Sequence, residues 1–149
     1  VAERYGKTDN LPVAFINGFG IKKGAIATSN SPDDNNVVVA GTNAADMALA
    51  INEVTRLGGG QVAVADGEVI GRLPLPVAGI VADIPAEEMA AAEQEMDRIA
   101  REELGSDLPS PFGQLLFLSI TAIPEWAITD LGLIDCVKFV VTDPVISSN

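Results

Sequence analysis

Residues 37–73 read VVVAGTNAADMALAINEVTRLGGGQVAVADGEVIGRL, and this stretch carries the clearest structural signals of the chain. It opens with the continuous apolar run Val37–Ala40, which is typical of a strand covered on both faces. Thr42 and Asn43 supply side-chain oxygens that cap a helix, and a run of three glycines beginning at Gly58 ends it. The stretch therefore predicts a strand and then a helix over Asn43–Leu57.

The second part of the same stretch predicts a β-hairpin. Two runs rich in apolar residues, Gln61–Ala65 and Glu68–Leu73, are separated only by Asp66 and Gly67. This dipeptide tolerates the positive φ values that a tight type I′ turn requires at both central residues. We therefore expect the two runs to pair as antiparallel strands.

A second helix is predicted over Pro85–Leu104. Proline is well tolerated at the first helical position, because its missing N–H would have no partner inside the helix. Apolar residues then recur at spacings of three and four among charged ones, which predicts a helix with one buried face. In the two predicted helices, the side chains expected in the core are Met47, Ile51, Val54, Met89 and Ile99.

The rest of the chain reads as mostly β. The apolar, β-like runs are Leu11–Ile16, Gly24–Thr28, Pro76–Ala82, Gln114–Ile123 and Asp135–Val141. The predicted fold class is α/β (α+β), a layered domain in which two main helices cover a mostly β core. The order β-α-β-β occurs in residues 37–73 and again in residues 77–141, which reflects either an internal duplication or the alternation common to α/β proteins.

The composition indicates how many domains to expect and which binding partners are disfavoured. The chain has 149 residues, of which 48% are hydrophobic and 20% charged, so we expect one folded domain, residues 1–149. With 9 Lys and Arg against 21 Asp and Glu, its net charge of −12 disfavours nucleic acid and anionic lipid as partners. No apolar run is long enough for a membrane span. A single cysteine, Cys136, excludes an internal disulfide, and a cytoplasmic location is the default expectation.

The absence of histidine limits the chemistry that the chain can perform. Imidazole is the usual zinc ligand and the usual acid–base group near neutral pH, so we predict no catalytic residue and no metal ligand in this chain. Because it begins at Val1 rather than Met and lacks the features of a signal peptide, we interpret the chain as an excised or processed fragment.

Two short motifs have both a functional and a structural interpretation. Gly18-x-Gly20 resembles part of a dinucleotide fingerprint, but the residues that follow do not predict a helix, so a turn is favoured. The acidic pair Asp33 and Asp34 offers oxygen ligands for a hard cation, but its spacing differs from that of an EF-hand, so a solvated turn is favoured.

The combination of several spaced motifs resembles the C-terminal domain of bacterial and archaeal adenine deaminases, which belong to the metal-dependent amidohydrolase superfamily. The resemblance extends from the N-terminus to about Cys136. The matching segments are Glu3-Arg4 with Thr8 and Asn10, Gly18-Phe19-Gly20, Lys23–Ala27, Gly41–Asn43, Asp46–Ala50, Gly58–Gly60, Asp66–Val69, Leu73–Gly79 and Pro85–Glu88.

This resemblance implies a catalytic (β/α)₈ barrel that precedes Val1 in the parent enzyme. The barrel would hold a divalent metal ion such as manganese, iron or zinc, whose bound hydroxide converts adenine and water to hypoxanthine and ammonia. The chain itself would be an accessory domain that packs on the barrel, binds no cofactor and is inactive alone. A homo-oligomer is a further expected assembly. The alternative is a self-standing, non-catalytic binding or assembly module derived from that family.

A loop over residues 29–36 is the segment expected to line the mouth of the active site. Its candidate residues are Ser29, Asp33 and Asn36, and the structural alternative is a surface turn. The family usually has His-Asp-Ser-His-Asn where this chain has residues 32–36, and only Asp33 and Asn36 match that pattern. Asp33 would accept a hydrogen bond from a purine amino group or orient water, and Asn36 offers both a donor and an acceptor.

Overall fold

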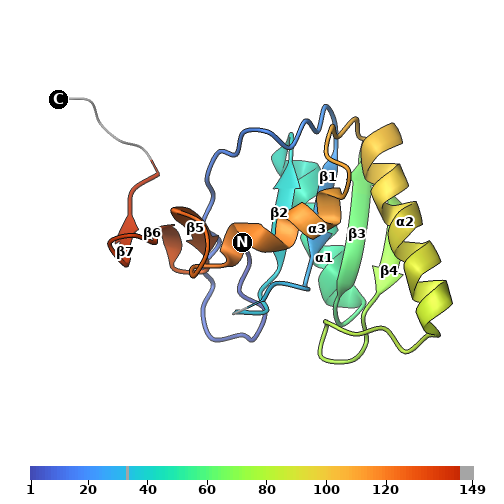
Figure 1. Cartoon of the computed structure of the whole chain (residues 1–149), viewed down its shortest axis with the longest axis horizontal. Coiled ribbons are helices and arrows are strands. Elements are labelled where there is room, and N and C mark those ends of the chain that lie inside the picture. Colours follow the sequence, from blue (N-terminus) through green and yellow to red (C-terminus); the bar gives the residue numbers. More distant parts are fainter. Residues whose placement is uncertain (33, 145–149) are drawn as a thin grey trace.

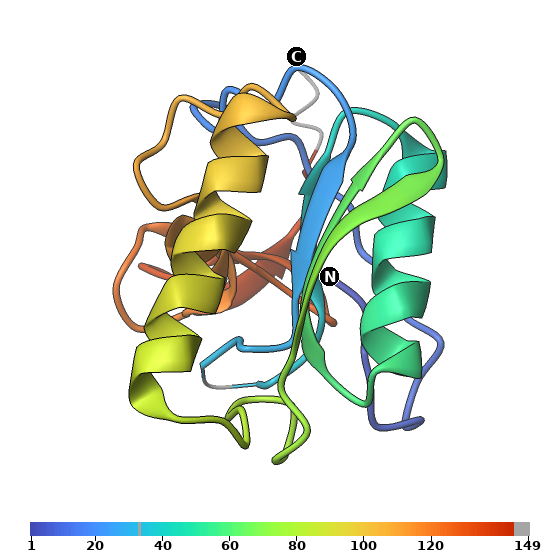
Figure 2. The same cartoon turned by 90° about the vertical axis from the view of Figure 1, so that its right-hand side faces the viewer.

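The computed structural model describes residues 1–32 and 34–144 and has an antiparallel sheet of strand order β2-β1-β3-β4 at its centre (Figure 1). The strands of this sheet are β1 (Ala25–Thr28), β2 (Val38–Gly41), β3 (Gly60–Ala65) and β4 (Glu68–Pro74). Helix α1 (Ala44–Arg56) covers one face, and α2 (Ala86–Glu102) with α3 (Pro111–Leu115) covers the other (Figure 2). The layered α+β class predicted from the sequence is confirmed.

Strand alternation gives the sheet two separate apolar cores. Ile26 packs with α2 and α3, whereas its neighbours Ala25 and Ala27 pack with α1. Successive side chains of a strand point to opposite faces, so a sheet covered on both sides buries every position. All residues of β1 and β3 are accordingly buried.

The local signals of residues 37–73 are confirmed. Asn43 caps α1, because its Oδ1 accepts a hydrogen bond from the Asp46 N–H at 2.9 Å. The helix ends in a Schellman motif, in which the N–H groups of Gly58 and Gly59 donate to the carbonyls of Thr55 and Val54.

The predicted hairpin turn is also confirmed. Asp66 and Gly67 have φ values of 53° and 79°, as a type I′ turn requires. The Gly67 N–H donates to Asp46 Oδ1 at 2.9 Å, so the same aspartate that lies in the first turn of α1 also holds the tip of the hairpin.

The buried face of α1 differs from the predicted one. Val54 is buried at 1% exposure, but Met47 and Ile51 are only half-buried, and the face instead contains Ala50 and Glu53. Glu53 is accommodated because its carboxylate accepts hydrogen bonds from Arg56 and from Arg72 of β4. These bonds lower the pKa of Glu53 from 4.5 to about 2, so the buried carboxylate stays charged and paired.

On α2, Ile99 is buried as predicted, whereas Met89 is half-buried near the beginning of the helix. Pro85 is the residue before the helix rather than its first residue, and its carbonyl accepts the hydrogen bond from the Met89 N–H at 2.9 Å. Gly105, with φ 79°, follows the end of the helix, as expected.

The apolar run predicted as a strand over Gln114–Ile123 is instead helical. It contains the end of α3 and the 3₁₀ helix η1 (Leu116–Ser119). Phe112, Leu115 and Ser119 are buried at spacings of three and four, so the run packs one helical face. The periodicity of a short apolar run does not distinguish a buried strand from a buried helix. Pro111 at the first position of α3 favours the helix.

The run predicted as one strand over Asp135–Val141 is instead a turn that joins two strands of a second, smaller antiparallel sheet. That sheet contains β5 (Trp126–Thr129), β6 (Gly132–Asp135) and β7 (Val140–Thr142) and lies to one side of the main sheet (Figure 1). Asp135 reverses the chain, because its carboxylate accepts hydrogen bonds from the N–H and the Nζ of Lys138 at 3.0 and 2.8 Å.

Two further predicted strands are absent from the described residues. Residues 11–16 and 76–82 form no strand, although Val77 and Val81 make one isolated bridge. Pro12 and Pro76 each lack the N–H that a sheet ladder uses. Without a strand at 76–82, and with α3 and η1 in place of the run at 114–123, the second half does not repeat the β-α-β-β order of the first.

Candidate functional site

Ser29, the first candidate of the predicted loop, is fully buried at the end of β1. Its hydroxyl donates to the Gly79 carbonyl at 2.7 Å and accepts from the Gly60 N–H at 2.8 Å. Both partners are backbone groups of other segments. Ser29 therefore ties the beginning of the loop to β3 and to the segment that follows β4.

Asn36, at the other end of the loop, is 3% exposed and is also bonded within the chain. Its Oδ1 accepts from the Arg4 N–H at 3.4 Å, and its Nδ2 donates to Asp34 Oδ2 at 3.3 Å. Asp34 also accepts from the Ser31 hydroxyl at 2.8 Å, so the turn is held by its own side chains. Asp33 lies outside the described residues. The structure thus connects Asn36 to Asp34 and anchors Ser29 separately.

A contact that sequence reasoning missed holds the neighbouring segment. The guanidinium of Arg4 donates from Nη2 to the Ala78 carbonyl and lies over the ring of Tyr5 at 5.3 Å. Gly79 has a φ of 74°, which favours glycine, and a Cβ there would displace the guanidinium of Arg4. Arg4 and Gly79 both belong to the motifs that carry the family resemblance, and this shared membership is the sequence signal that points to the contact.

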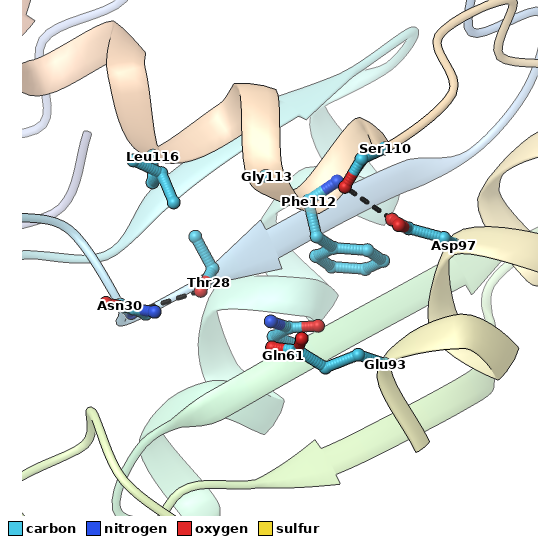
Figure 3. A pocket seen from close by; sticks show the side chains of 9 residues that line it. All are labelled: Thr28, Asn30, Gln61, Glu93, Asp97, Ser110, Phe112, Gly113 and Leu116. Atoms are coloured by element: carbon cyan, nitrogen blue, oxygen red, sulfur yellow. Dashed lines mark hydrogen bonds between the residues drawn. The ribbon is translucent and has the colours of Figure 1, made fainter. Parts of the chain in front are cut away.

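A polar pocket lies where β1 and β3 meet α2 and α3 (Figure 3). Its cavity is about 70 Å³. Among the residues that line it are Thr28, Asn30, Gln61, Glu93, Asp97 and Phe112.

Gln61 is the most unusual residue of this pocket. It is paired with Thr28 across the sheet and lies on the same face as Ala63, which belongs to the core beneath α2. Its side chain is in the cavity and the residue is only 6% exposed, yet its Oε1 has no hydrogen-bond partner among the described residues. Buried acceptors are normally paired, so Gln61 Oε1 can accept a hydrogen bond from a donor, or coordinate a cation, that enters the cavity.

The two carboxylates of the pocket come from one face of α2. Glu93 and Asp97 are four residues apart, and Asp97 Oδ1 accepts from the Phe112 N–H at 3.4 Å, which joins α2 to the start of α3. In Figure 3, Gln61 lies between Phe112 and Glu93. Sequence analysis did not identify this pocket, because it requires the register between β1 and β3.

The residues of this chain do not fit the transition-metal site that the resemblance implies for the parent enzyme. The chain has no histidine, and its described part contains no group of three or more His, Cys, Asp or Glu residues placed to hold a metal ion. Within residues 1–32 and 34–144, no helix has the length and apolar composition needed to cross a membrane.

Comparison with known proteins gives one family over nearly the whole chain. The family model described as "Adenine deaminase C-terminal domain" matches residues 1–140. "Adenine deaminase 4" of Rhizobium meliloti is 54% identical over 145 residues, which are 97% of this chain and 24% of the relative. "Adenine deaminase 1" of Desulfotalea psychrophila is 49% identical over 149 residues, which are 100% of this chain and 25% of the relative. The chain spans about a quarter of the length of these curated relatives.

Proposed function

The chain belongs to the adenine deaminase C-terminal domain family, and from this premise we propose that it is the accessory domain of an adenine deaminase-like amidohydrolase. The catalytic barrel, with its divalent metal ion, is then a separate part of the parent enzyme. The proposed reaction of that enzyme converts adenine and water to hypoxanthine and ammonia. In this proposal the chain stabilises the barrel, supplies no metal ligand and lends a loop to the mouth of the active site.

The observation that carries the proposal is the unequal coverage in the comparisons. The two curated adenine deaminases described above match 97% and 100% of this chain, while the chain covers only 24% and 25% of their length. The other three quarters of such an enzyme must hold whatever chemistry this chain lacks. The absence of histidine agrees with this division, because imidazole is the usual ligand of a hydrolytic transition-metal centre.

An exposed apolar segment supports docking to a larger body. Leu11, Val13 and Phe15 are 57%, 67% and 105% exposed, and the residues between them are half-buried. The alternation presents three large apolar side chains to solvent from a segment without a strand partner among the described residues. Such a surface is typical of an interface, and we propose the catalytic barrel as its partner.

The loop of residues 29–36 is proposed to lie at the mouth of that barrel. Ser29 and Asn36 are buried and bonded within the domain, so their proposed role is to position the loop rather than to touch substrate. Their hydrogen bonds fix both ends of the loop, which suits a segment that must hold a constant shape beside a substrate. Asp33, which lies outside the described residues, is the residue proposed to contact substrate.

A chimera tests the proposal. The matching quarter of the Rhizobium meliloti relative is replaced by this chain, and ammonia release from adenine is measured with added Mn²⁺. We expect the chimera to be active, a truncated enzyme without this quarter to be impaired, and the 149-residue chain alone to be inactive. Turnover by the isolated chain that survives repurification, or a chimera no better than the truncated enzyme, would contradict the proposal.

The loop has its own test in the active chimera. Asp33→Asn keeps the size of the side chain and removes its charge. A role in the site predicts a fall in kcat/KM of about tenfold or more, equivalent to roughly 1.4 kcal/mol of transition-state stabilisation. Asp9→Asn, on the exposed N-terminal segment, is the control and should leave kcat/KM unchanged. If both variants keep the parent kinetics, the loop is a surface turn.

A further inference from the structure

We propose that the polar pocket between β3, α2 and α3 binds a small monovalent cation through oxygen atoms, with Gln61 Oε1 as its buried ligand. This site is separate from the catalytic metal expected in the barrel. It also does not depend on the proposed docking, although Asn30 of the loop 29–36 lies in its lining. The inference rests on the position of Gln61, on the charge of the pocket and on its size.

Gln61 lies on a face of β3 whose other residues are small and apolar. Ala63 and Ala65 follow it on the same face, and both belong to the core beneath α2. An amide at this position loses its hydration when the sheet is covered, and an unpaired buried carbonyl oxygen then destabilises the fold. A bound cation or donor would remove this cost, and the cavity beside Oε1 is the place from which it can do so.

The charge of the pocket selects a cation. Glu93 and Asp97 both line it, and none of the described residues around the cavity is Lys or Arg. Thr28 adds a neutral hydroxyl oxygen to the lining, and this oxygen accepts a hydrogen bond from the Asn30 N–H at 3.0 Å (Figure 3). An anion would meet two carboxylates without a compensating positive charge, which excludes phosphate-like ligands.

The size and ligand set favour a single monovalent ion. A cavity of about 70 Å³ holds one small ion with a water molecule and is too small for a nucleobase. Calcium typically requires six to eight oxygen ligands with several carboxylates, and magnesium needs near-ideal octahedral geometry. Two carboxylates with neutral amide and hydroxyl oxygens fit a weakly held ion such as potassium or ammonium better.

Salt-dependent melting of the 149-residue chain tests the inference. Melting temperatures are compared in potassium, ammonium, sodium and choline chloride at equal ionic strength, because choline is too large for the cavity. At a concentration about ten times the Kd, the bound ion should raise the Tm by roughly 3 °C over choline. Equal Tm values in all four salts would mean that water alone fills the cavity, and the proposal would be wrong.

Two variants assign the effect to this pocket. Gln61→Met keeps the volume of the side chain and removes the buried acceptor, so the chain should fold and lose the difference between potassium or ammonium and choline. Glu93→Gln removes one charge at a solvent-exposed residue and should reduce that difference. Glu88→Gln, on α2 but outside the pocket lining, is the matched control and should keep it.

The same measurements contain results that would overturn the assignment. If Gln61→Met retains the full response, the ion binds elsewhere. If Mg²⁺ or Ca²⁺ at equal concentration stabilises the chain more than any monovalent ion, and Gln61→Met abolishes that effect, the site is divalent and the proposal is wrong. Anomalous scattering from crystals soaked in rubidium should give a peak beside Gln61 Oε1.

Discussion

Gly59 packs against Gly79 so closely that a Cβ atom added to Gly59 would overlap the Cα atom of Gly79. The hydroxyl of Ser29 lies in the same contact, 3.0 Å from that Cβ position. Three segments therefore meet where any side chain larger than hydrogen is excluded. This contact joins the end of α1 to the segment after β4 and to the beginning of the loop 29–36.

Substitution of Gly59 by alanine should be strongly destabilising. The new methyl group would overlap backbone, and the φ of 127° is a conformation that L-residues rarely adopt. We expect a loss of at least about 2 kcal/mol in the free energy of unfolding, measured by urea denaturation. Gly58→Ala is the control, because Gly58 also has a positive φ, 74°, but has open space around its Cβ position. Equal losses in both variants would show that backbone strain, not the contact, decides the effect.

Removal of the Ser29 hydroxyl should cost stability without touching the surface. Ser29→Ala leaves the buried Gly60 N–H and Gly79 carbonyl without their partner, and we expect a loss of about 1–3 kcal/mol. Thr55→Ala on the exposed face of α1 should change the free energy of unfolding by no more than about 0.5 kcal/mol. A Ser29 variant as stable as the parent would mean that both backbone groups find other partners.

The Glu53 cluster predicts a specific dependence of stability on pH. The pKa of Glu53 is lowered from 4.5 to about 2, first by hydrogen bonds from Arg56 and then by those from Arg72. Between these two values the unfolded chain binds the proton and the folded chain does not, so stability falls as the pH falls through this window. Above it, the contribution of Glu53 is fully present.

Glu53→Gln should therefore be less stable than the parent at pH 7, by about 1 kcal/mol, since both arginines are partly exposed and solvent weakens the pairing. The difference between parent and variant should shrink as the pH falls from 4.5 toward 2, as followed by chemical denaturation. Glu88→Gln, an exposed residue of α2, is the control and should give no such change. A difference that stays constant down to pH 2 would contradict the assignment.

The sequence was most informative where the signals are local. The cap at Asn43, the glycines after Leu57 and the turn at Asp66 each act through neighbouring backbone groups, and the structure has all of them as predicted. Which residues of a helix are buried depends instead on contacts between distant parts of the chain. Ile51 has the spacing of a core residue, but Glu53 is more buried, because Arg72 of a neighbouring strand supplies its partner.

The candidate sites show the same division. The sequence places Ser29 and Asn36 in a polar loop, but their burial follows from partners more than 30 residues away, Gly79 and Arg4. The sequence predicts a strand at Gln61, and its polar side chain on the same face as Ala63 is the available signal. Its significance appears only when α2 and α3 close the cavity over it, and neither periodicity nor capping predicts that packing.

The last prediction concerns the exposed apolar segment. Phe15 is 105% exposed, so it contributes no burial to the folded chain, and Phe15→Ser should leave the free energy of unfolding of the 149-residue chain unchanged within about 0.5 kcal/mol. If this segment packs on a catalytic domain, the same substitution in the chimera replaces a buried aromatic ring by a hydroxyl. It should then lower the melting temperature by several degrees, because burial of such a side chain contributes about 2–3 kcal/mol.

The comparison between the two contexts separates docking from folding. Asp9→Ser, on the same exposed segment, should be neutral in both the isolated chain and the chimera. A Phe15 variant that is neutral in both would place the interface elsewhere on the domain, and the exposed side chains around β7 would be the next surface to substitute. A Phe15 variant that destabilises the isolated chain would instead mean that the segment packs on the domain itself, because only a side chain buried before docking loses contacts when it is removed.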